Sequence, residues 1–128
     1  MKRAARVHER EFDTLAKTWD LMIDGYWLIA GAIHPALDWH ILVECKRARL
    51  AASEYLVKNG IFLRPEIKVL FVELNRLMIN LLAEHRENLS TPHKPERKLS
   101  DEYRKHGGAI MDGIERKVHE RLWSSVPR

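Results

Sequence analysis

The charged side chains of this sequence offer one kind of chemistry, the electrostatic binding of a polyanion. The chain has 128 residues with 22 Lys or Arg and 18 Asp or Glu, a formal net charge of +4. Cations near phosphates release condensed counterions, which supplies affinity with little reading of base sequence. For any one cluster an ordinary solvated helix face is the commoner explanation, and the modest net charge alone does not predict nucleic-acid binding. The cations form three clusters: Lys2, Arg3, Arg6 and Arg10; Lys46, Arg47 and Arg49; Lys94, Arg97, Lys98, Arg104 and Lys105.

Residue types that hold metals or act as nucleophiles show no functional spacing. The seven histidines include no His-x3-His pair and no His-Glu-x2-His motif, so we expect neither a metal site nor a cofactor. Cys45 is the single cysteine and lies on an apolar helix face, where we expect it to be buried and unreactive. No glycine-rich phosphate loop follows a strand. The sequence therefore predicts a protein that is not an enzyme.

One short pattern keeps an enzymatic alternative open. The segment "RENLSTPH" places Arg86 and His93 in an Arg-x6-His arrangement. It resembles the motif of small HEPN-like helical ribonuclease toxins, in which the arginine holds the phosphate and the histidine acts on the ribose hydroxyl proton. Glu87 follows the arginine here and would repel a scissile phosphate, and so short a pattern arises readily by chance.

A second alternative is a small DNA-binding transcription regulator. The segment "KNGIFLRPE" is the only candidate for the turn of a helix-turn-helix motif, and its link between helices matches that motif poorly.

Hydrophobic periodicity predicts an all-α fold, a small bundle of about four helices. The first helix is expected over Ala4–Asp24, with Gly25 and Gly31 bracketing a looser link. The second is expected to start at Pro35, because proline's missing N–H has no partner in the first turn. It should end at "KNG", where Gly60 suits a left-handed capping position.

The third predicted helix starts at Pro65 and carries the clearest apolar stripe in the chain. A fourth is predicted over Ser100–Trp123, with Ser100 as N-cap and with Gly107, Gly108 and Gly113 weakening it. Residues 1–90 would form a helical core domain, and residues 91–128 a proline-containing basic hinge followed by the last helix. The hinge is either a plain linker or a basic arm.

The apolar stripe of the third predicted helix consists of Ile67, Leu70, Phe71, Leu74, Leu77, Met78, Leu81 and Leu82.

Length and hydropathy limit the size of the core and the cellular location of the protein. A chain of this size can bury one core. The most apolar run, residues 21–39, contains Asp24, His34, Pro35 and Asp38, so we do not expect a membrane helix, and no signal peptide is recognised. We expect a cytoplasmic protein.

We first expect the four tryptophans, at positions 19, 27, 39 and 123, to lie in the core. Tryptophans in excess of what one small core can enclose would suit interfaces between subunits.

Four segments in order carry a family resemblance: "TWDLMI" from Thr18, "CKRARLAASEYLVKNG" from Cys45, "RPEIKVLFVELNRLMINLLAE" from Arg64 and "NLSTPHKPERKL" from Asn88. The set resembles the terminase small subunits of tailed bacteriophages, in the family with a leucine-threonine-proline tail. Asn88 stands where that family usually has glycine, and Ser90 interrupts the leucine-threonine-proline order.

The resemblance implies a function in viral genome packaging. Such subunits bind double-stranded viral DNA, assemble as cyclic homo-oligomers, and regulate the terminase large subunit, which holds the ATPase and nuclease. Charge then nominates the DNA-binding residues. We expect Lys46, Arg47 and Arg49 first, because they lie in a rigid helix, whereas ordering a frayed terminus costs entropy. The further candidates are Lys2, Arg3 and Arg6, then Arg97 and Lys98.

Overall fold

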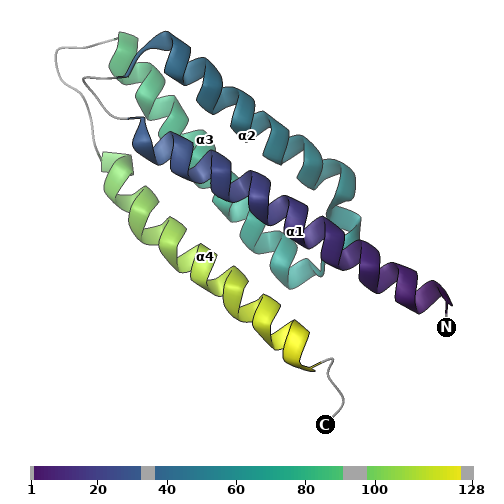
Figure 1. Ribbon diagram of the computed structural model, residues 1–128. Helices are drawn as coiled ribbons and strands as arrows, with labels where there is room; N and C mark the ends of the chain where they lie inside the picture. The colour runs from purple at the N-terminus through teal and green to yellow at the C-terminus, as the bar shows by residue number, and fades with distance from the viewer. Residues whose placement is uncertain (1, 33–36, 91–97, 125–128) are drawn as a thin grey trace.

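A computed structural model describes residues 2–32, 37–90 and 98–124, with side chains omitted for 2–7, 98 and 122–124. Its elements are α1 (Lys2–Gly31), α2 (Trp39–Asn59), the short 3-10 helix η1 (Gly60–Phe62), α3 (Pro65–Ser90) and α4 (Lys98–Ser124). The described residues contain no strand, so the predicted all-α fold is confirmed. Each helix runs antiparallel to the one before it (Figure 1). In the described part of the chain, no helix combines the length and apolarity needed to cross a membrane.

Helix α3 lies at the centre of the packing. It contacts α1, α2 and α4, whereas α1 and α4 meet only sparsely. The stripe predicted on α3 is confirmed, because five of its members are buried and the other three pack partly buried against the core. Tyr103 and Ile114 of α4 lie in the same core as residues of α1 and α3. The five buried members are Ile67, Phe71, Leu74, Met78 and Leu81.

Helix α1 is longer than predicted. It does not end at Asp24 but continues through Gly25 to Gly31. A Cβ on Gly25 would lie 3.4 Å from the Met78 sulfur and 3.8 Å from the backbone of Ala48. Glycine therefore marks the place where α2 and α3 approach α1 closely, and it does not mark a break in the helix.

The predicted start of α2 is wrong, whereas its predicted end at "KNG" is confirmed, with Gly60 as the C-cap but in a conformation other than the one predicted. Its N-cap is Asp38, whose Oδ1 accepts the Ile41 N–H at 2.8 Å, so the helix begins at Trp39 and not at Pro35. Pro35 itself lies outside the described residues. Gly60 has φ −60° and ψ −21°, a right-handed conformation, because the chain continues into η1. A Cβ on Gly60 would lie 2.9 Å from Cε of Lys68, the far end of a flexible side chain that can move aside, so this contact does not require glycine.

Helix α4 begins two residues earlier than predicted and is continuous through its three glycines. Ser100 lies inside its first turn and is not the N-cap. Instead, Oε1 of Glu84 on α3 accepts the backbone N–H of Leu99 at 3.2 Å. A carboxylate at this position complements the positive end of the helix. The predicted hinge, residues 91–97, lies outside the described residues.

A reciprocal tyrosine pair joins α1 to α4. The rings of Tyr26 and Tyr103 stack with centroids 4.3 Å apart and planes at 10°. The Tyr26 hydroxyl donates to the Tyr103 carbonyl at 3.0 Å, and the Tyr103 hydroxyl donates to the Tyr26 carbonyl at 2.7 Å. A Cβ on Gly107 would lie 2.4 Å from the Tyr26 ring. The absence of a side chain at Gly107 is therefore what lets the pair form.

An ion pair joins the other end of α1 to α4. The Glu11 carboxylate accepts from Nε of Arg121 at 3.1 Å and from its Nη2 at 3.2 Å, and Nε of Arg64 lies 3.6 Å away. The Arg121 hydrogen bond lowers the pKa of Glu11, although partial burial opposes the shift. Glu11 thus links α1, the start of α3 and the end of α4.

The tyrosine pair predicts opposite effects at two neighbouring glycines. Gly107→Ala should lower the free energy of unfolding by about 1–3 kcal/mol, because overpacking a buried contact has that cost. Gly108→Ala should raise it by up to about 1 kcal/mol, since nothing lies within 4 Å of a Cβ there and alanine favours helix. Urea denaturation measures both changes, and shifts of the same sign would refute the proposed role of Gly107.

The Glu11 ion pair predicts a pH-dependent contribution to stability. Its pKa is lowered from 4.5 on folding, so the contribution is present above about pH 4.5 and is lost as pH falls through the folded-state pKa. Glu11→Gln should cost about 1.5–3 kcal/mol at pH 7. Urea denaturation should show that cost shrinking in acid. Asp13→Asn, at an exposed neighbour, is the control and should change stability by less than about 0.5 kcal/mol. An equal loss of stability at pH 7 and in acid would show that the charged form of Glu11 does not cause the stabilisation.

Candidate nucleic-acid interface

The predicted basic cluster on α2 divides between two sides of the helix. Lys46 and Arg49 line a hollow of about 390 Å³ between α2 and α3, while Arg47 is exposed and does not line it. Residues three apart share a helix face, whereas the residue after Lys46 is rotated by about 100° away from it. Of the three preferred DNA-binding candidates, Lys46 and Arg49 therefore lie on one surface and Arg47 does not.

Helix α3 adds a third cation to this hollow. The antiparallel packing places the second half of α3 beside the first half of α2, so that Arg86 faces Lys46 and Arg49 across the hollow. Charge clustering along the sequence did not nominate Arg86 for DNA binding, because the other two cations are remote in the chain. The sequence does indicate that Arg86 shares a face of α3 with Ile79 and Ala83, because the three residues have helical spacing.

The rest of the hollow is apolar. Its walls come from Leu42 and Val43 on α2 and from Ile79, Leu82 and Ala83 on α3. Trp39 lies at the start of α2, where the Asp38 cap fixes the backbone, and it is 55% exposed. An exposed indole beside cations can stack on a base or sugar while the cations contact phosphates. The hollow thus offers polyanion binding with an aromatic contact.

The three cations of the hollow have no ion-pair partner among the described residues. The ion pairs formed among those residues involve other side chains, such as His40 with Glu44 on the outer side of α2 at 3.4 Å. No described carboxylate lines the hollow. Since no described residue neutralises Lys46, Arg49 or Arg86, phosphate groups would be suitable counterions for them.

The remaining predicted DNA-binding residues are not brought to this hollow. Lys2, Arg3 and Arg6 open α1 at the end of the bundle opposite to the start of α2 (Figure 1). Lys98 opens α4, and Arg97 lies outside the described residues. Among the described residues, the helix starts at Lys2 and at Lys98 are therefore not part of the α2–α3 hollow.

Of the two residues in the ribonuclease-like pattern, only Arg86 is described, and it lines the α2–α3 hollow. His93 lies outside the described residues. His85 is buried, and its Nε2 lies 3.0 Å from the carbonyl oxygen of Ile29. Cys45 is buried as predicted, and burial raises the pKa of its thiol to about 11. Within the described ranges, no three His, Cys, Asp or Glu side chains gather as a metal site.

The tryptophans lie mostly outside the core. Trp19 is half-buried against it, whereas Trp27 and Trp39 are both more than half exposed. The side chain of Trp123 lies outside the described residues. The first expectation, that tryptophans fill the core, is therefore wrong for Trp27 and Trp39, because Tyr26 and Leu42 beside them occupy the inward positions.

Comparison with known proteins finds no matching family model, no matching curated protein and no matching solved structure. What the chain does is therefore inferred from its own residues.

Proposed function

We propose that this chain is a non-catalytic DNA-binding adaptor of the phage terminase small-subunit kind. It would bind duplex DNA at the α2–α3 hollow and present it to a terminase large subunit in the cytoplasm of the host. The observation that supports it best is the gathering of Lys46, Arg49 and Arg86, three cations without a described ion-pair partner, around one hollow. The sequence resemblance supplies the biological setting.

The chemistry of the hollow favours backbone contacts over base reading. The three cations match a row of phosphates, and the exposed indole can stack on a base or sugar. Among the described lining residues no Asn, Gln, Asp or Glu could pair with an adenine or cytosine edge, so guanine, through the arginines, is the base that these side chains could read. Binding by one copy should be weak and strongly dependent on salt. Repetition of the contact in an oligomer would raise the affinity without new contacts.

Exposed aliphatic residues at the turn between α2 and α3 support self-association. Val57 is 78% exposed and Ile61 is 79% exposed, and Val69 on α3 is also largely exposed. Apolar groups in such number at one end of a small protein favour burial against another copy.

Light scattering at micromolar concentrations should give the mass of a closed ring, and Val57→Ser with Ile61→Ser should lower that mass. A monomeric wild-type chain would contradict the proposed ring.

The hollow predicts which cations matter for DNA. Lys46→Gln, Arg49→Gln and Arg86→Gln should each weaken duplex binding, equally for unrelated base sequences. Each lost phosphate contact should reduce the slope of log affinity against log salt by about 0.9. Fluorescence anisotropy with two labelled duplexes over a salt series measures affinity and slope together.

Arg47→Gln is the matched control, because it removes one charge from α2 outside the hollow. If Arg47→Gln weakens binding as much as Arg49→Gln does, general charge and not the hollow holds DNA. Metal-independent RNA cleavage that is lost in Arg86→Gln or His93→Ala would replace the adaptor proposal with the ribonuclease alternative.

A further inference from the structure

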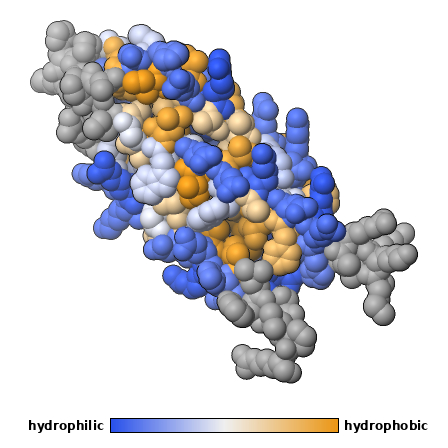
Figure 2. Space-filling view, in the orientation of Figure 1, coloured by the Kyte–Doolittle hydropathy of each residue, from blue (hydrophilic) through white to orange (hydrophobic). Residues whose placement is uncertain are grey.

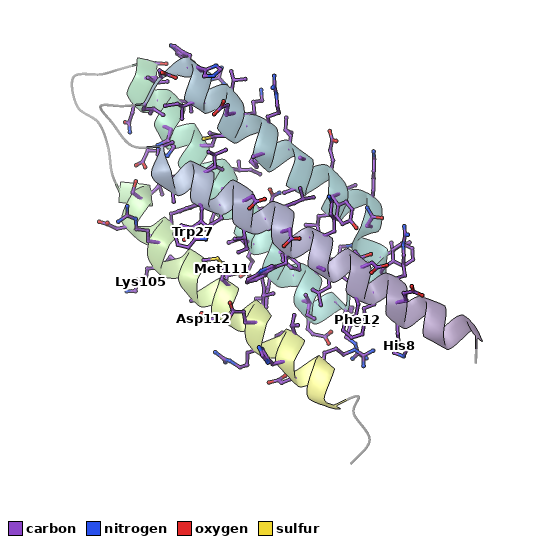
Figure 3. All side chains as sticks on the ribbon, viewed as in Figure 1. His8, Phe12, Trp27, Lys105, Met111 and Asp112 are labelled. Carbon is purple, nitrogen blue, oxygen red and sulfur yellow. The ribbon has the colours of Figure 1, made fainter. Side chains whose placement is uncertain are left out.

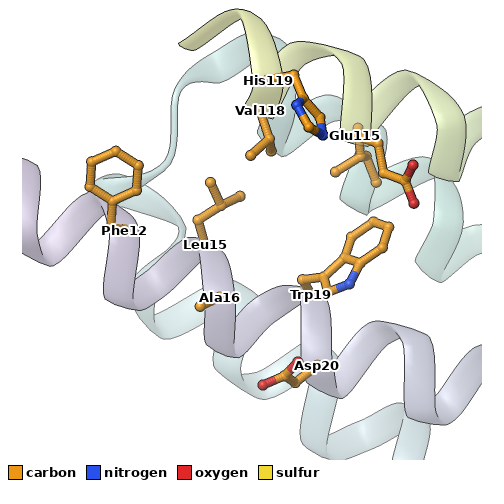
Figure 4. Close-up of a pocket in the computed structure, with 9 residues that line it drawn as sticks. Phe12, Leu15, Ala16, Trp19, Asp20, Glu115, Val118 and His119 are labelled. Atoms are coloured by element: carbon orange, nitrogen blue, oxygen red, sulfur yellow. The ribbon is translucent and has the colours of Figure 1, made fainter. Parts of the chain in front are cut away.

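A second groove is lined by α1 and α4. In the bundle α1 packs beside α2 and α4 packs beside α3, so this groove lies across the bundle from the α2–α3 hollow, and Figure 1 shows the course of the four helices. Its volume is about 380 Å³. The tyrosine pair joins the two helices at one end and the Glu11–Arg121 ion pair joins them at the other, so they stand apart between these two contacts. Figure 4 shows side chains of both helices facing the space between them.

The floor and walls of this groove are apolar and partly aromatic. Phe12, Leu15, Ala16 and Trp19 line it from α1, and Ile114 and Val118 line it from α4. Figure 2 shows hydrophobic surface on this face of the molecule, surrounded by hydrophilic residues. The same side of α1 continues to Trp27, which is 58% exposed (Figure 3). Large aromatic groups left in contact with water mark an interaction surface.

The border of the groove is acidic. Asp20 on α1 and Glu115 on α4 line it from its two walls. Glu9, Asp13 and Asp24 extend the row along α1 at exposed positions, and none of these carboxylates forms an ion pair with a described residue. Lys17 lies among them, also exposed, so the row has an excess of negative charge and is not purely acidic. Of the lining residues only His119 can carry a positive charge. An acidic rim in a chain of net charge +4 is a local arrangement and does not follow from composition.

We propose that the α1–α4 groove binds an amphipathic helix of a partner protein, with bulky apolar side chains on one face and Lys or Arg on its flanks. An elongated groove between two antiparallel helices matches the shape of a third helix, and the aromatic floor matches its apolar anchors. Asp20 and Glu115 would pair with its flanking cations, which fixes its register and steers its approach.

The charges on the rim discriminate against other occupants. The carboxylates repel nucleic acid, so the groove does not duplicate the α2–α3 hollow. Pairing with the same groove of a second copy would set carboxylates against carboxylates. Because the two grooves lie on opposite faces, a DNA duplex and a partner helix would bind together, and the partner site does not depend on the DNA proposal.

The probe is a synthetic helical peptide with leucines at three- and four-residue spacing and lysines elsewhere. Its control is the same peptide with glutamate in place of every lysine. Titration calorimetry with the full chain should show binding of the lysine peptide and affinity at least about tenfold lower for the glutamate peptide. The triple variant Asp13→Asn, Asp20→Asn, Glu115→Gln should lose about tenfold in affinity for the lysine peptide while its affinity for duplex DNA does not fall.

The matched control removes three exposed carboxylates outside the groove, as Glu54→Gln, Glu73→Gln and Glu102→Gln, and should keep wild-type peptide affinity. Equal losses in both triple variants, or in neither, would overturn the proposal, because binding would then follow net charge. Ala16→Arg is a second check, since it should block the groove while circular dichroism shows a folded chain. A different outcome would be that the peptide dissociates the oligomer and that the Lys46, Arg49 and Arg86 variants dissociate it too. The groove would then be occupied by a second copy of the chain, and the partner-helix proposal would be wrong.

Discussion

The tyrosine pair between α1 and α4 is the contact on which the arrangement of the bundle depends. It fixes two helices that are remote in the sequence, because each hydroxyl bonds the other residue's backbone and the two rings stack. Both side chains are almost completely buried, so neither hydroxyl could lose its partner without leaving an unsatisfied polar group. The position of α4 relative to α1 therefore depends on this pair, on the Glu11–Arg121 ion pair and on the packing of both helices against α3, since α1 and α4 share no continuous apolar seam.

The openness of the α1–α4 side follows from that constraint. With helix contacts concentrated on α3, the two outer helices are joined to each other by the tyrosine pair and by the Glu11–Arg121 ion pair. The groove between these contacts retains aromatic residues that a tighter bundle would bury. On the other side, Ser53 and Asn75 link α2 to α3 at 3.4 Å, and short side chains such as Ala83 leave the basic hollow open. One face is acidic and the other basic, which suits an adaptor with two different ligands.

Local patterns predicted the parts of the fold that depend on local physics. The apolar period of α3, its proline start and the burial of Cys45 could all be derived from neighbouring residues. Gly25 was interpreted as the start of a looser link and Gly107 as helix-weakening, because their sequence neighbours do not show what lies beside them in the fold. The ring beside Gly107 belongs to a tyrosine 81 positions earlier in the numbering, from Tyr26 to Gly107. Likewise, the cap of α4 comes from Glu84 on another helix, so Ser100 was the only local candidate.

The candidate site was predictable to the same extent. Charge found Lys46 and Arg49, but Arg86 joins them only through tertiary packing, and helical rotation removes Arg47 from the surface. The acidic groove could not be predicted, because nothing in the sequence indicates that α1 and α4 are neighbours.

The central claim is that duplex DNA contacts the α2–α3 hollow, and amide chemical-shift mapping tests it most directly. Titration of the isotope-labelled chain with a short duplex should shift amide resonances of residues 39–50 and 79–90, while those of Phe12–Asp20 on α1 should stay unchanged. Shifts centred on the first turns of α1 or on α4, with the α2–α3 hollow unaffected at saturating DNA, would contradict the account.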